Sequence, residues 1–212
     1  MVMEFEPKKL SYSKINDLSW EFLKQKNRHL QIPIPIEEIA EFDLGLNIIP
    51  INRLRADFDT EGFISSSFED LYVDQDTYEK IATRYRFTIA HEIGHLVLHK
   101  DIFEQFSFSS IEEWKQFVSE TDDEQRSWLE YQGYSFAGCI LVPSPHLKKS
   151  FEEAKIRLES KITKAKNERI DRKTLIDFLL DQIAAEIAPF FDVSIETVKK
   201  RLSKENYHER IL

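Results

Sequence analysis

The spacing of hydrophobic residues along the chain changes near Tyr78. After that point apolar residues recur three and four positions apart, which is the spacing of one face of an α-helix. Residues suited to cap helices mark two of the starts, Asp122 or Asp123 for one helix and Ser194 for another. The pattern predicts helices over residues 80–99, 111–118, 124–141, 145–160, 171–188 and 194–203.

The part of the chain before Tyr78 has a different pattern. A helix is expected over residues 13–27, and the proline-interrupted stretch QIPIPIEEIAEF leads into a second, short helix. Three short segments, LGLNIIPI, GFISSS and DLYVD, predict strands. A few short strands followed by many helices indicate an α+β fold, with a small sheet and a mostly helical C-terminal half, and not alternating βαβ units.

Composition and charge bear on the expected cellular compartment and on the classes of partner that the protein binds. The single cysteine, Cys139, excludes an intrachain disulfide and is expected to be a small core residue. No apolar signal segment or apolar run of bilayer length is present, so we expect a cytoplasmic protein without membrane contact. Of the 29 Lys+Arg and 38 Asp+Glu residues, 11 and 9 lie in residues 161–212, which leaves residues 1–160 with a net charge of -11 and argues against direct nucleic-acid binding.

One predicted helix carries titratable residues inside a stretch that otherwise reads as buried, TIAHEIGHLVLH. His91 and His95 are four residues apart, so their imidazoles leave the same face of the helix and can share one Zn²⁺. Glu92 lies about 100° further around the helix. There it can take a proton from a water that the metal activates.

A catalytic zinc needs a third protein ligand and keeps one position open. The metzincin arrangement would place Gly at position 98 and His at position 101, and Leu98 and Asp101 exclude that class. His99 lies too far along the same helix to be the third ligand, so we expect a structural or supporting role for it.

Glu130 is the carboxylate best suited to complete the ligand set. Gly133 and Ala137 follow it on the same face of its predicted helix, and such small residues let a second helix approach closely. The other carboxylates of this region lie in polar, charge-rich surroundings that are typical of a solvated surface. Glu130 is therefore the predicted third ligand.

These segments resemble the ImmA/IrrE family of zinc metallopeptidases. The resemblance rests on RYRFTIAHEIGHLVLHK, on EYQGYSFAGCILVP and on GFISSSFEDLYVD, and it covers roughly residues 30 to 145. It implies a zincin-like fold in which His91, His95 and Glu130 bind zinc and Glu92 is the catalytic base.

Two positions depart from the family pattern. Gly133 stands where alanine is usual, and Tyr134 stands where asparagine is usual. Zinc peptidases usually add a donor that stabilises an oxyanion opposite the metal. Tyr131, Tyr134 and His146 are the candidates for that donor, and the sequence leaves the choice among them open.

The resemblance implies an endopeptidase that cleaves a helix-turn-helix transcriptional repressor and so relieves repression of a mobile element or a stress response. The alternative is a non-catalytic binding module whose metal site is structural or vestigial. The intact ligands and Glu92 favour the enzyme. We expect residues 1–160 to form the zinc metallopeptidase domain with a helical N-terminal lead-in, and residues 161–212 to form a helical extension packed on it.

Two further features have ordinary structural explanations, and a third has a possible role in substrate binding. Arg84 and Arg86, before the metal helix, are expected to pair with acidic groups of the protein itself. The basic triplet at residues 199–201 is expected to belong to a packed helix, because so short a basic run is weak evidence for DNA recognition. Either GFISSS or DLYVD could provide a sheet edge for a substrate strand, and the sequence does not separate them.

Overall fold

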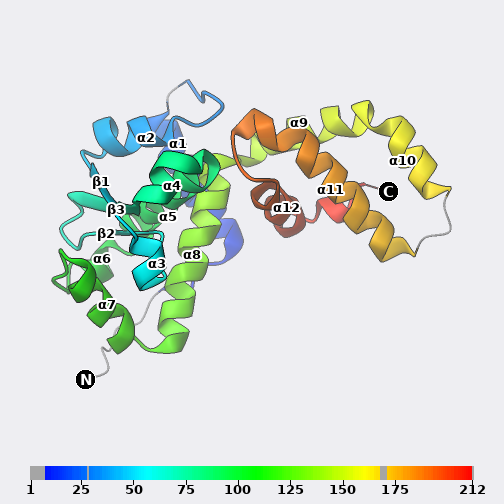
Figure 1. The fold of residues 1–212 in the computed structure, drawn as a ribbon. Coiled ribbons are helices and arrows are strands. Elements are labelled where there is room, and N and C mark those ends of the chain that lie inside the picture. Colours follow the sequence, from blue (N-terminus) through cyan, green and yellow to red (C-terminus); the bar gives the residue numbers. More distant parts are fainter. Residues whose placement is uncertain (1–7, 28, 168–170, 212) are drawn as a thin grey trace. The chain divides into compact units, whose positions relative to one another are not determined.

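The computed structural model describes residues 8–27, 29–167 and 171–211. The chain forms two compact units, Met1–Ile140 and Leu141–Leu212. The first unit holds a three-stranded sheet among helices, and the described part of the second is helical (Figure 1). This architecture confirms the predicted α+β class. The division of the chain into a peptidase domain up to residue 160 and an extension after it stays a prediction.

The sheet consists of β1 (Asn47–Ile51), β2 (Gly62–Ile64) and β3 (Asp70–Asp74), in the order β1-β3-β2. β1 runs parallel to β3, and β2 runs antiparallel to it. DLYVD is therefore the central strand, and GFI at the start of GFISSS is an edge strand. Of the two segments, GFISSS is therefore the one that offers a sheet edge next to the helix that carries His91 and His95.

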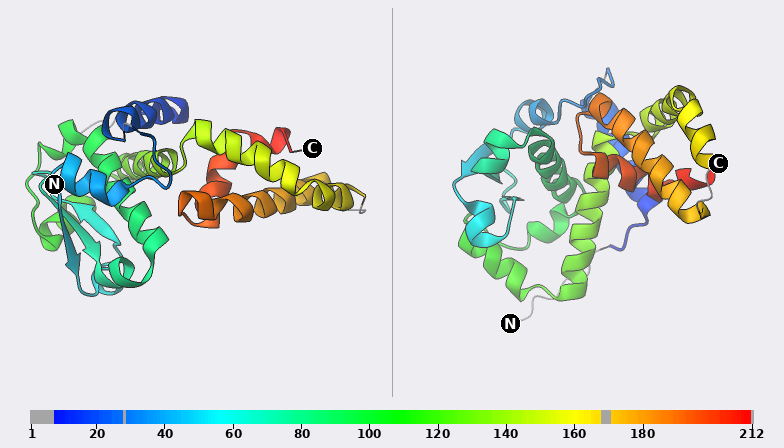
Figure 2. Two further views of the ribbon diagram at one scale, coloured as in Figure 1. Left: turned by 90° about the horizontal axis from the view of Figure 1, so that it is seen from above. Right: turned by 45° about the vertical axis from the view of Figure 1, so that its right-hand side comes forward.

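Nine helical segments precede or flank this sheet in the described part of the first unit. They are α1 (Tyr12–Lys26), α2 (Ile36–Glu38), the π-helical turn η1 (Ile39–Asp43), α3 (Leu54–Phe58), α4 (Gln75–Lys80), α5 (Ala82–Leu98), α6 (Lys100–Phe103), α7 (Ile111–Glu120) and α8 (Asp123–Leu141). Figures 1 and 2 show α5 between the sheet on one side and the long helix α8 on the other. The element that carries His91 and His95 is thus held from two sides.

The helix predicted over 80–99 is interrupted at Ile81, which separates α4 from α5. Asp74, the last residue of β3, starts α4 by accepting a hydrogen bond from the Thr77 N–H at 3.0 Å. The short helices α3, α4 and α6 were not predicted, because segments this short are not stable by themselves and depend on packing.

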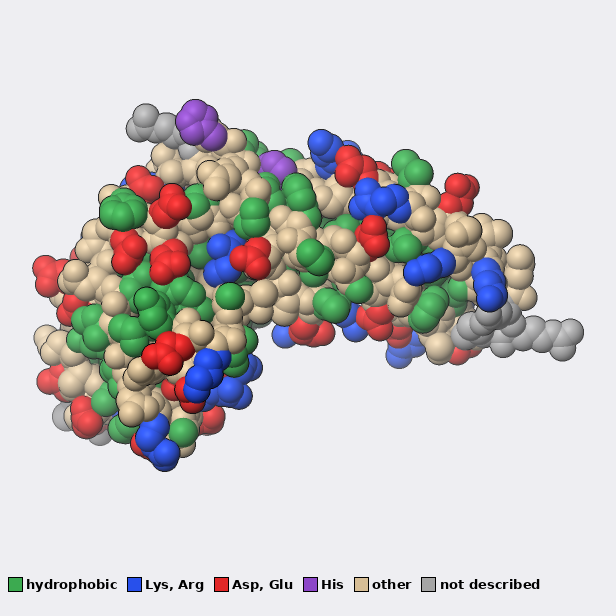
Figure 3. All heavy atoms as spheres, turned by 45° about the horizontal axis from the view of Figure 1, so that its top comes forward, with side chains coloured by type: hydrophobic (Ala, Val, Ile, Leu, Met, Phe, Trp, Pro, Cys, Tyr) green, Lys and Arg blue, Asp and Glu red, His purple; other side chains and the backbone are tan. Residues whose placement is uncertain are grey.

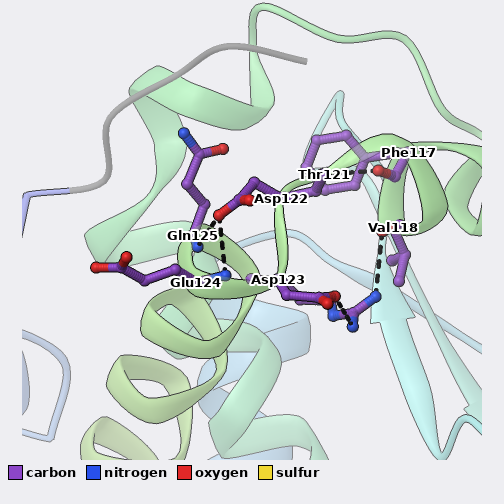
Figure 4. Close-up of polar contacts among 8 residues, drawn as sticks. Phe117, Val118, Thr121, Asp122, Asp123, Glu124 and Gln125 are labelled. Carbon is purple, nitrogen blue, oxygen red and sulfur yellow. Dashed lines mark hydrogen bonds and ion pairs between the residues drawn. The ribbon is translucent and has the colours of Figure 1, made fainter. Parts of the chain in front are cut away.

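Helix α8 begins at a capped turn that follows α7 (Figure 4). The Asp122 carboxylate accepts hydrogen bonds from the backbone N–H groups of Glu124 and Gln125 at 2.9 and 3.2 Å, so Asp122 and not Asp123 is the cap. Arg126 joins the two helices, since it donates to Asp123 at 2.6 Å and to the Val118 carbonyl at 3.4 Å. These contacts fix the start of the helix that carries Glu130.

The second unit contains α9 (Ser144–Arg157), α10 (Glu159–Lys166), α11 (Arg172–Phe191), α12 (Ile195–Lys204) and the 3₁₀ turn η2 (Tyr207–Glu209). The helix predicted over 145–160 is confirmed as α9, which ends at Arg157, slightly earlier than predicted, and a separate helix, α10, follows after Leu158. Side chains of both signs are interspersed on the face of this unit drawn in Figure 3, in agreement with its exposed ion pairs such as Arg157–Glu186 at 2.8 Å.

The turn between α11 and α12 is formed by Asp192, in the left-handed conformation at φ 51°, and by Ser194, whose hydroxyl caps α12 through the Thr197 N–H at 3.1 Å. Phe191 and Val193 on either side of Asp192 are buried. The segment therefore packs within the second unit, and the predicted cap at Ser194 is confirmed.

Arg201 shows why the basic triplet is not a uniform basic surface. Its side chain is only 3% exposed, and its guanidinium donates to the Val142 carbonyl at 3.1 Å, to the Ser144 hydroxyl at 2.9 Å and to Glu205 at 2.6 Å. A buried charge is tolerated only when it is paired and hydrogen-bonded in this way. The prediction of a packed helix at 199–201 is confirmed for Arg201.

Within the described ranges, no helix has both the length and the apolar character needed to cross a bilayer.

We expect Arg201→Leu to lower the stability of α11 and α12 by about 3 kcal/mol, because it leaves Glu205 and the Val142 carbonyl without their buried partner. Amide hydrogen exchange of these two helices measures the effect. Lys200→Leu is the matched control on the same helix: its side chain is 75% exposed, and we expect a change within about 0.5 kcal/mol. Equal protection in both variants would contradict the role given to Arg201.

Candidate metal centre

Helices α5 and α8 approach each other closely because glycines face each other where they cross. A Cβ atom added to Gly94 of α5 would lie 3.2 Å from Phe136 Cβ and 3.3 Å from the backbone of Gly133 on α8. A Cβ atom added to Gly133 would lie 2.9 Å from the His91 ring and 3.0 Å from Nε2 of His95. The crossing therefore places the middle of α8 directly against the two histidines.

The structure brings His91, His95 and Glu130 together. The two histidine Nε2 atoms are 3.0 Å apart, and Glu130 oxygens lie 3.4 Å from Nε2 of His91 and 3.9 Å from Nε2 of His95. Nitrogen and oxygen ligands about 2.0–2.1 Å from a tetrahedral zinc lie about 3.3 Å apart. Two imidazoles and one carboxylate in this arrangement fit a divalent metal such as zinc.

The three groups already influence each other electrostatically. Burial acts to raise the pKa of the Glu130 carboxyl, but the hydrogen bond with His91 and the nearby charges of His91, His99 and Arg126 together outweigh burial and leave that pKa lowered. Burial also acts to lower the pKa of His91, and the contact with Glu130 and the charge of Glu92 reverse this. Burial, helped by the neighbouring His91 and His99, lowers the pKa of His95 well below its usual value. A cation at this position would find an ionised carboxylate and a neutral imidazole.

Glu92 lies beside the ligand atoms and does not join them. Its side chain is buried, and burial raises its pKa to about 7, although His91 and a backbone hydrogen bond from Ile64 act to lower it. Ile64 belongs to the edge strand β2. The carboxylate therefore lies between α5, which carries the two histidines, and β2 at the edge of the sheet. A general base would be needed at this position.

A cavity of about 1040 Å³ opens over these residues. His91, Glu92, His95 and Glu130 line its floor, and β2 lines it through Gly62. A Cβ atom added to Gly62 would lie 2.6 Å from the Thr88 side chain of α5, so glycine is what lets the edge strand lie against the metal helix. Trp114, Lys115 and Phe117 of α7 form the facing wall.

Ion pairs at the edge of this cavity involve a residue that the sequence did not single out. Glu61, directly before β2, lies 3.1 Å from Arg84 and 3.5 Å from Arg55. Arg84 therefore pairs with an acidic group of the protein, as predicted. Arg86 donates to the Ile34 carbonyl at 2.8 Å, and an acidic partner for it stays a prediction. Glu61 had no signal in the sequence beyond its position before a predicted strand.

The three candidates for an oxyanion donor lie in different places. Tyr134 lines the cavity, and its ring lies 4.5 Å from the His91 ring and 6.0 Å from Phe87. Tyr131 packs on Trp128, with ring centroids 5.6 Å apart, and His146 belongs to α9 of the second unit. Burial and the negative charge of Glu130 raise the pKa of Tyr134, so its hydroxyl keeps its proton at neutral pH.

His99 ends α5 and is buried, and burial lowers its pKa to about 4. Its Nδ1 atom lies 3.0 Å from Nδ1 of His95, on the side of the His95 ring that faces away from the ligand cluster. His99 is therefore not a third ligand, in agreement with the geometric argument from the sequence. Cys139 is buried and free, as expected for a core residue.

Comparison with known proteins identifies the family. The model of the IrrE N-terminal-like domain, peptidase family M78, matches residues 77–203, which is more than half of the chain. The chain belongs to this family of metallopeptidases, and the resemblance inferred from the sequence is confirmed. Metallopeptidases work with a bound metal, and the His/Glu cluster described above is a possible site for it.

A Mycobacterium tuberculosis transcriptional regulator of known structure has a similar fold, with a TM-score of 0.52 and 16% sequence identity. The similarity covers 91% of this chain and 48% of the regulator, so the chain spans about half of that protein's length. At this identity the comparison shows the fold alone. No curated protein sequence matches the chain.

We expect Gly94→Ala to push α8 away from α5 and so to weaken metal binding. In a helix, alanine is more stable than glycine by about 1 kcal/mol, whereas crowding at the crossing costs about 1–3 kcal/mol. We expect the crowding to be the larger effect, so that the variant shows a net loss of stability. Thermal unfolding and metal titration measure the two consequences. A variant that is more stable and binds metal as tightly as the wild type would contradict a role for this contact.

Proposed function

We propose that this chain is a zinc-dependent endopeptidase that cleaves a helix-turn-helix transcriptional repressor. The observation that carries the proposal is the convergence of His91, His95 and Glu130 at the floor of a large cavity, with Glu92 beside them. Membership in a metallopeptidase family supports it.

The donor set supports zinc as the metal. Two imidazole nitrogens and one carboxylate are the ligands of many catalytic zinc sites, which keep a further position open. A metal held there would supply a Lewis acid that polarises a peptide carbonyl and makes a nearby water more acidic.

Glu92 is the residue of this chain that would move protons. Its position beside the ligand cluster suits it to accept a proton from the attacking water and to return it to the leaving amine. The hydrogen bond from Ile64 orients the carboxylate relative to the edge strand. The base and the strand that would hold the substrate are thereby linked.

The edge of β2 that faces away from β3 is the proposed seat of the substrate backbone. Asp74 donates to the Glu61 carbonyl, and Ser65 donates to the Asp70 carbonyl, so the alternate residues Gly62 and Ile64 direct their backbone groups away from β3. An extended peptide added along this edge would run past Glu92. Recognition of an extended backbone gives little side-chain specificity, so selectivity would come from docking of a folded partner.

Tyr134 is the proposed donor to the developing oxyanion. It lines the same cavity as Glu92 and keeps its proton at neutral pH. A donor aimed at the developing charge contributes typically 10²–10³-fold to the rate.

The substrate class rests on family membership, and the similarity in fold to a transcriptional regulator bears on the architecture alone. A cytoplasmic repressor encoded beside this protein is the proposed partner. The competing possibility, a binding module with a structural metal, makes a different prediction for the variants below.

We expect the purified chain to bind one zinc ion, and Glu130→Ala to lose most of it, because two histidines remain as ligands. Elemental analysis after reconstitution and dialysis measures the content. Glu124→Ala is the control, since this exposed carboxylate lies on the same helix and pairs with Lys9. Full zinc retention by Glu130→Ala would remove this residue from the ligand set.

We expect Glu92→Gln to keep the zinc and the fold but to cleave the repressor about 10²–10⁴-fold more slowly, since the amide cannot accept the proton. Cleavage is followed by electrophoresis with enzyme below the repressor concentration. Glu79→Gln, an exposed change on α4, should cleave like the wild type. If wild type and Glu92→Gln relieve repression equally and no fragment forms, the protein acts as a binding module.

A further inference from the structure

A buried chain of polar side chains leads away from the ligand cluster on the far side of His95. Nδ1 of His95 lies 3.0 Å from Nδ1 of His99, and the His99 side chain meets Gln132 of α8. The Gln132 amide donates to the Lys8 carbonyl at 3.0 Å. His99 is 2% exposed and Gln132 is 0% exposed. Three parts of the first unit, α5 with its C-terminal end, α8 and the N-terminal segment, therefore meet in one line of contacts.

The hydrogen-bonding capacity of these groups fixes which ring nitrogen of each histidine carries a proton. A histidine that binds a metal through Nε2 carries its proton on Nδ1. That proton needs an acceptor, and His99 Nδ1 is the atom next to it. A neutral imidazole has one donor and one acceptor, so His99 then carries its own proton on Nε2.

The hydrogen-bonding roles of the Gln132 amide agree with this assignment of the protons. Because the Gln132 nitrogen donates to the Lys8 carbonyl, its oxygen is left as an acceptor towards His99. Among the described residues, Nε2 of His99 and Oε1 of Gln132 are both buried without a hydrogen bond of standard length. Buried polar atoms are nearly always paired, and these two complement each other as donor and acceptor.

From this arrangement we infer that His99 is a positioning residue, which accepts the Nδ1 proton of His95 and thereby presents the free Nε2 of His95 to the metal, with Gln132 and the Lys8 carbonyl holding His99 in turn. The inference rests on the proposed metal site. Groups that orient a ligand in this way typically change metal affinity by about 10–100-fold when removed.

The other histidine ligand has no equivalent support. Within the described ranges, Nδ1 of His91 is buried without a hydrogen-bond partner and faces the Gly133 position. The His95 ring is held further by Phe103, whose ring stacks on it at 5.3 Å and 18°. His95 is therefore the oriented ligand of the pair.

The test uses the full chain and two substitutions at one position. His99→Phe keeps a ring and removes both hydrogen bonds, whereas His99→Gln keeps an acceptor and a donor. Affinity for Zn²⁺ is measured by competition with a chelator, and the visible spectrum of bound Co²⁺ reports the ligand geometry. Phe108→Leu is the packing control, since Phe108 is buried against Phe103, with ring centroids 5.5 Å apart.

We expect one metal per chain in every variant at saturation, an affinity about 10–100-fold weaker for His99→Phe, and a clearly smaller loss for His99→Gln. The Co²⁺ spectrum should change in His99→Phe and not in Phe108→Leu. Gln132→Leu removes the next group in the line and should weaken binding less than His99→Phe does. Circular dichroism of each variant checks that the fold is kept.

The inference about His99 is wrong if His99→Phe binds metal like the wild type, or if His99→Gln loses as much affinity as His99→Phe. Both outcomes are separable from failure of the metal site itself. If His95→Ala and Glu130→Ala also bind like the wild type, the proposed ligand set is wrong. If those two lose the metal while His99→Phe does not, the ligand set stands and the positioning role alone is rejected.

Discussion

The close crossing of α5 and α8 is the contact on which the metal site depends. His91 and His95 come from one helix and Glu130 from the other, so their ligand atoms meet only if the helices approach more closely than ordinary side chains permit. Gly94 and Gly133 make that approach possible, because even one added carbon at either position would meet the opposite helix or the histidine rings. The cap at Asp122 and the Arg126 contacts to α7 fix the start of α8, within eight residues of Glu130.

Bringing a carboxylate and several imidazoles into one buried place is costly unless each polar group has a partner. The structure offsets this cost by pairing Glu130 with His91, Glu92 with the backbone of Ile64, and His95 with His99. The same pairings orient the groups for chemistry. Stability and function therefore depend on the same hydrogen bonds, which is common where residues with shifted pKa values gather at a cavity.

The sheet contributes to the site mainly through one short edge strand. β3 is covered on both sides by β1 and β2, and β2 leaves one edge towards the cavity. Gly62 allows this strand to lie on α5, so the backbone that would receive a peptide and the base that would act on it lie side by side. A longer strand is not needed, because Glu92, the proposed base, and the two histidines lie on α5 and not on the sheet.

The sequence by itself determined the elements whose signals are local. Four-residue spacing placed His91 and His95 on one face of a helix, apolar periodicity found the long helices, and small residues after Glu130 indicated a helix that another could approach. Tertiary structure decided everything that depends on residues distant in the chain. It decided that β2 is the edge strand next to the cavity and that α9 and α10 are separate helices. It also decided that Tyr134 and not Tyr131 lines the cavity, and that Gln132, held by the Lys8 carbonyl, contacts His99. The physical reason is that periodicity records which way a side chain points from its own helix, whereas a hydrogen-bond partner is set by which other element packs against that face.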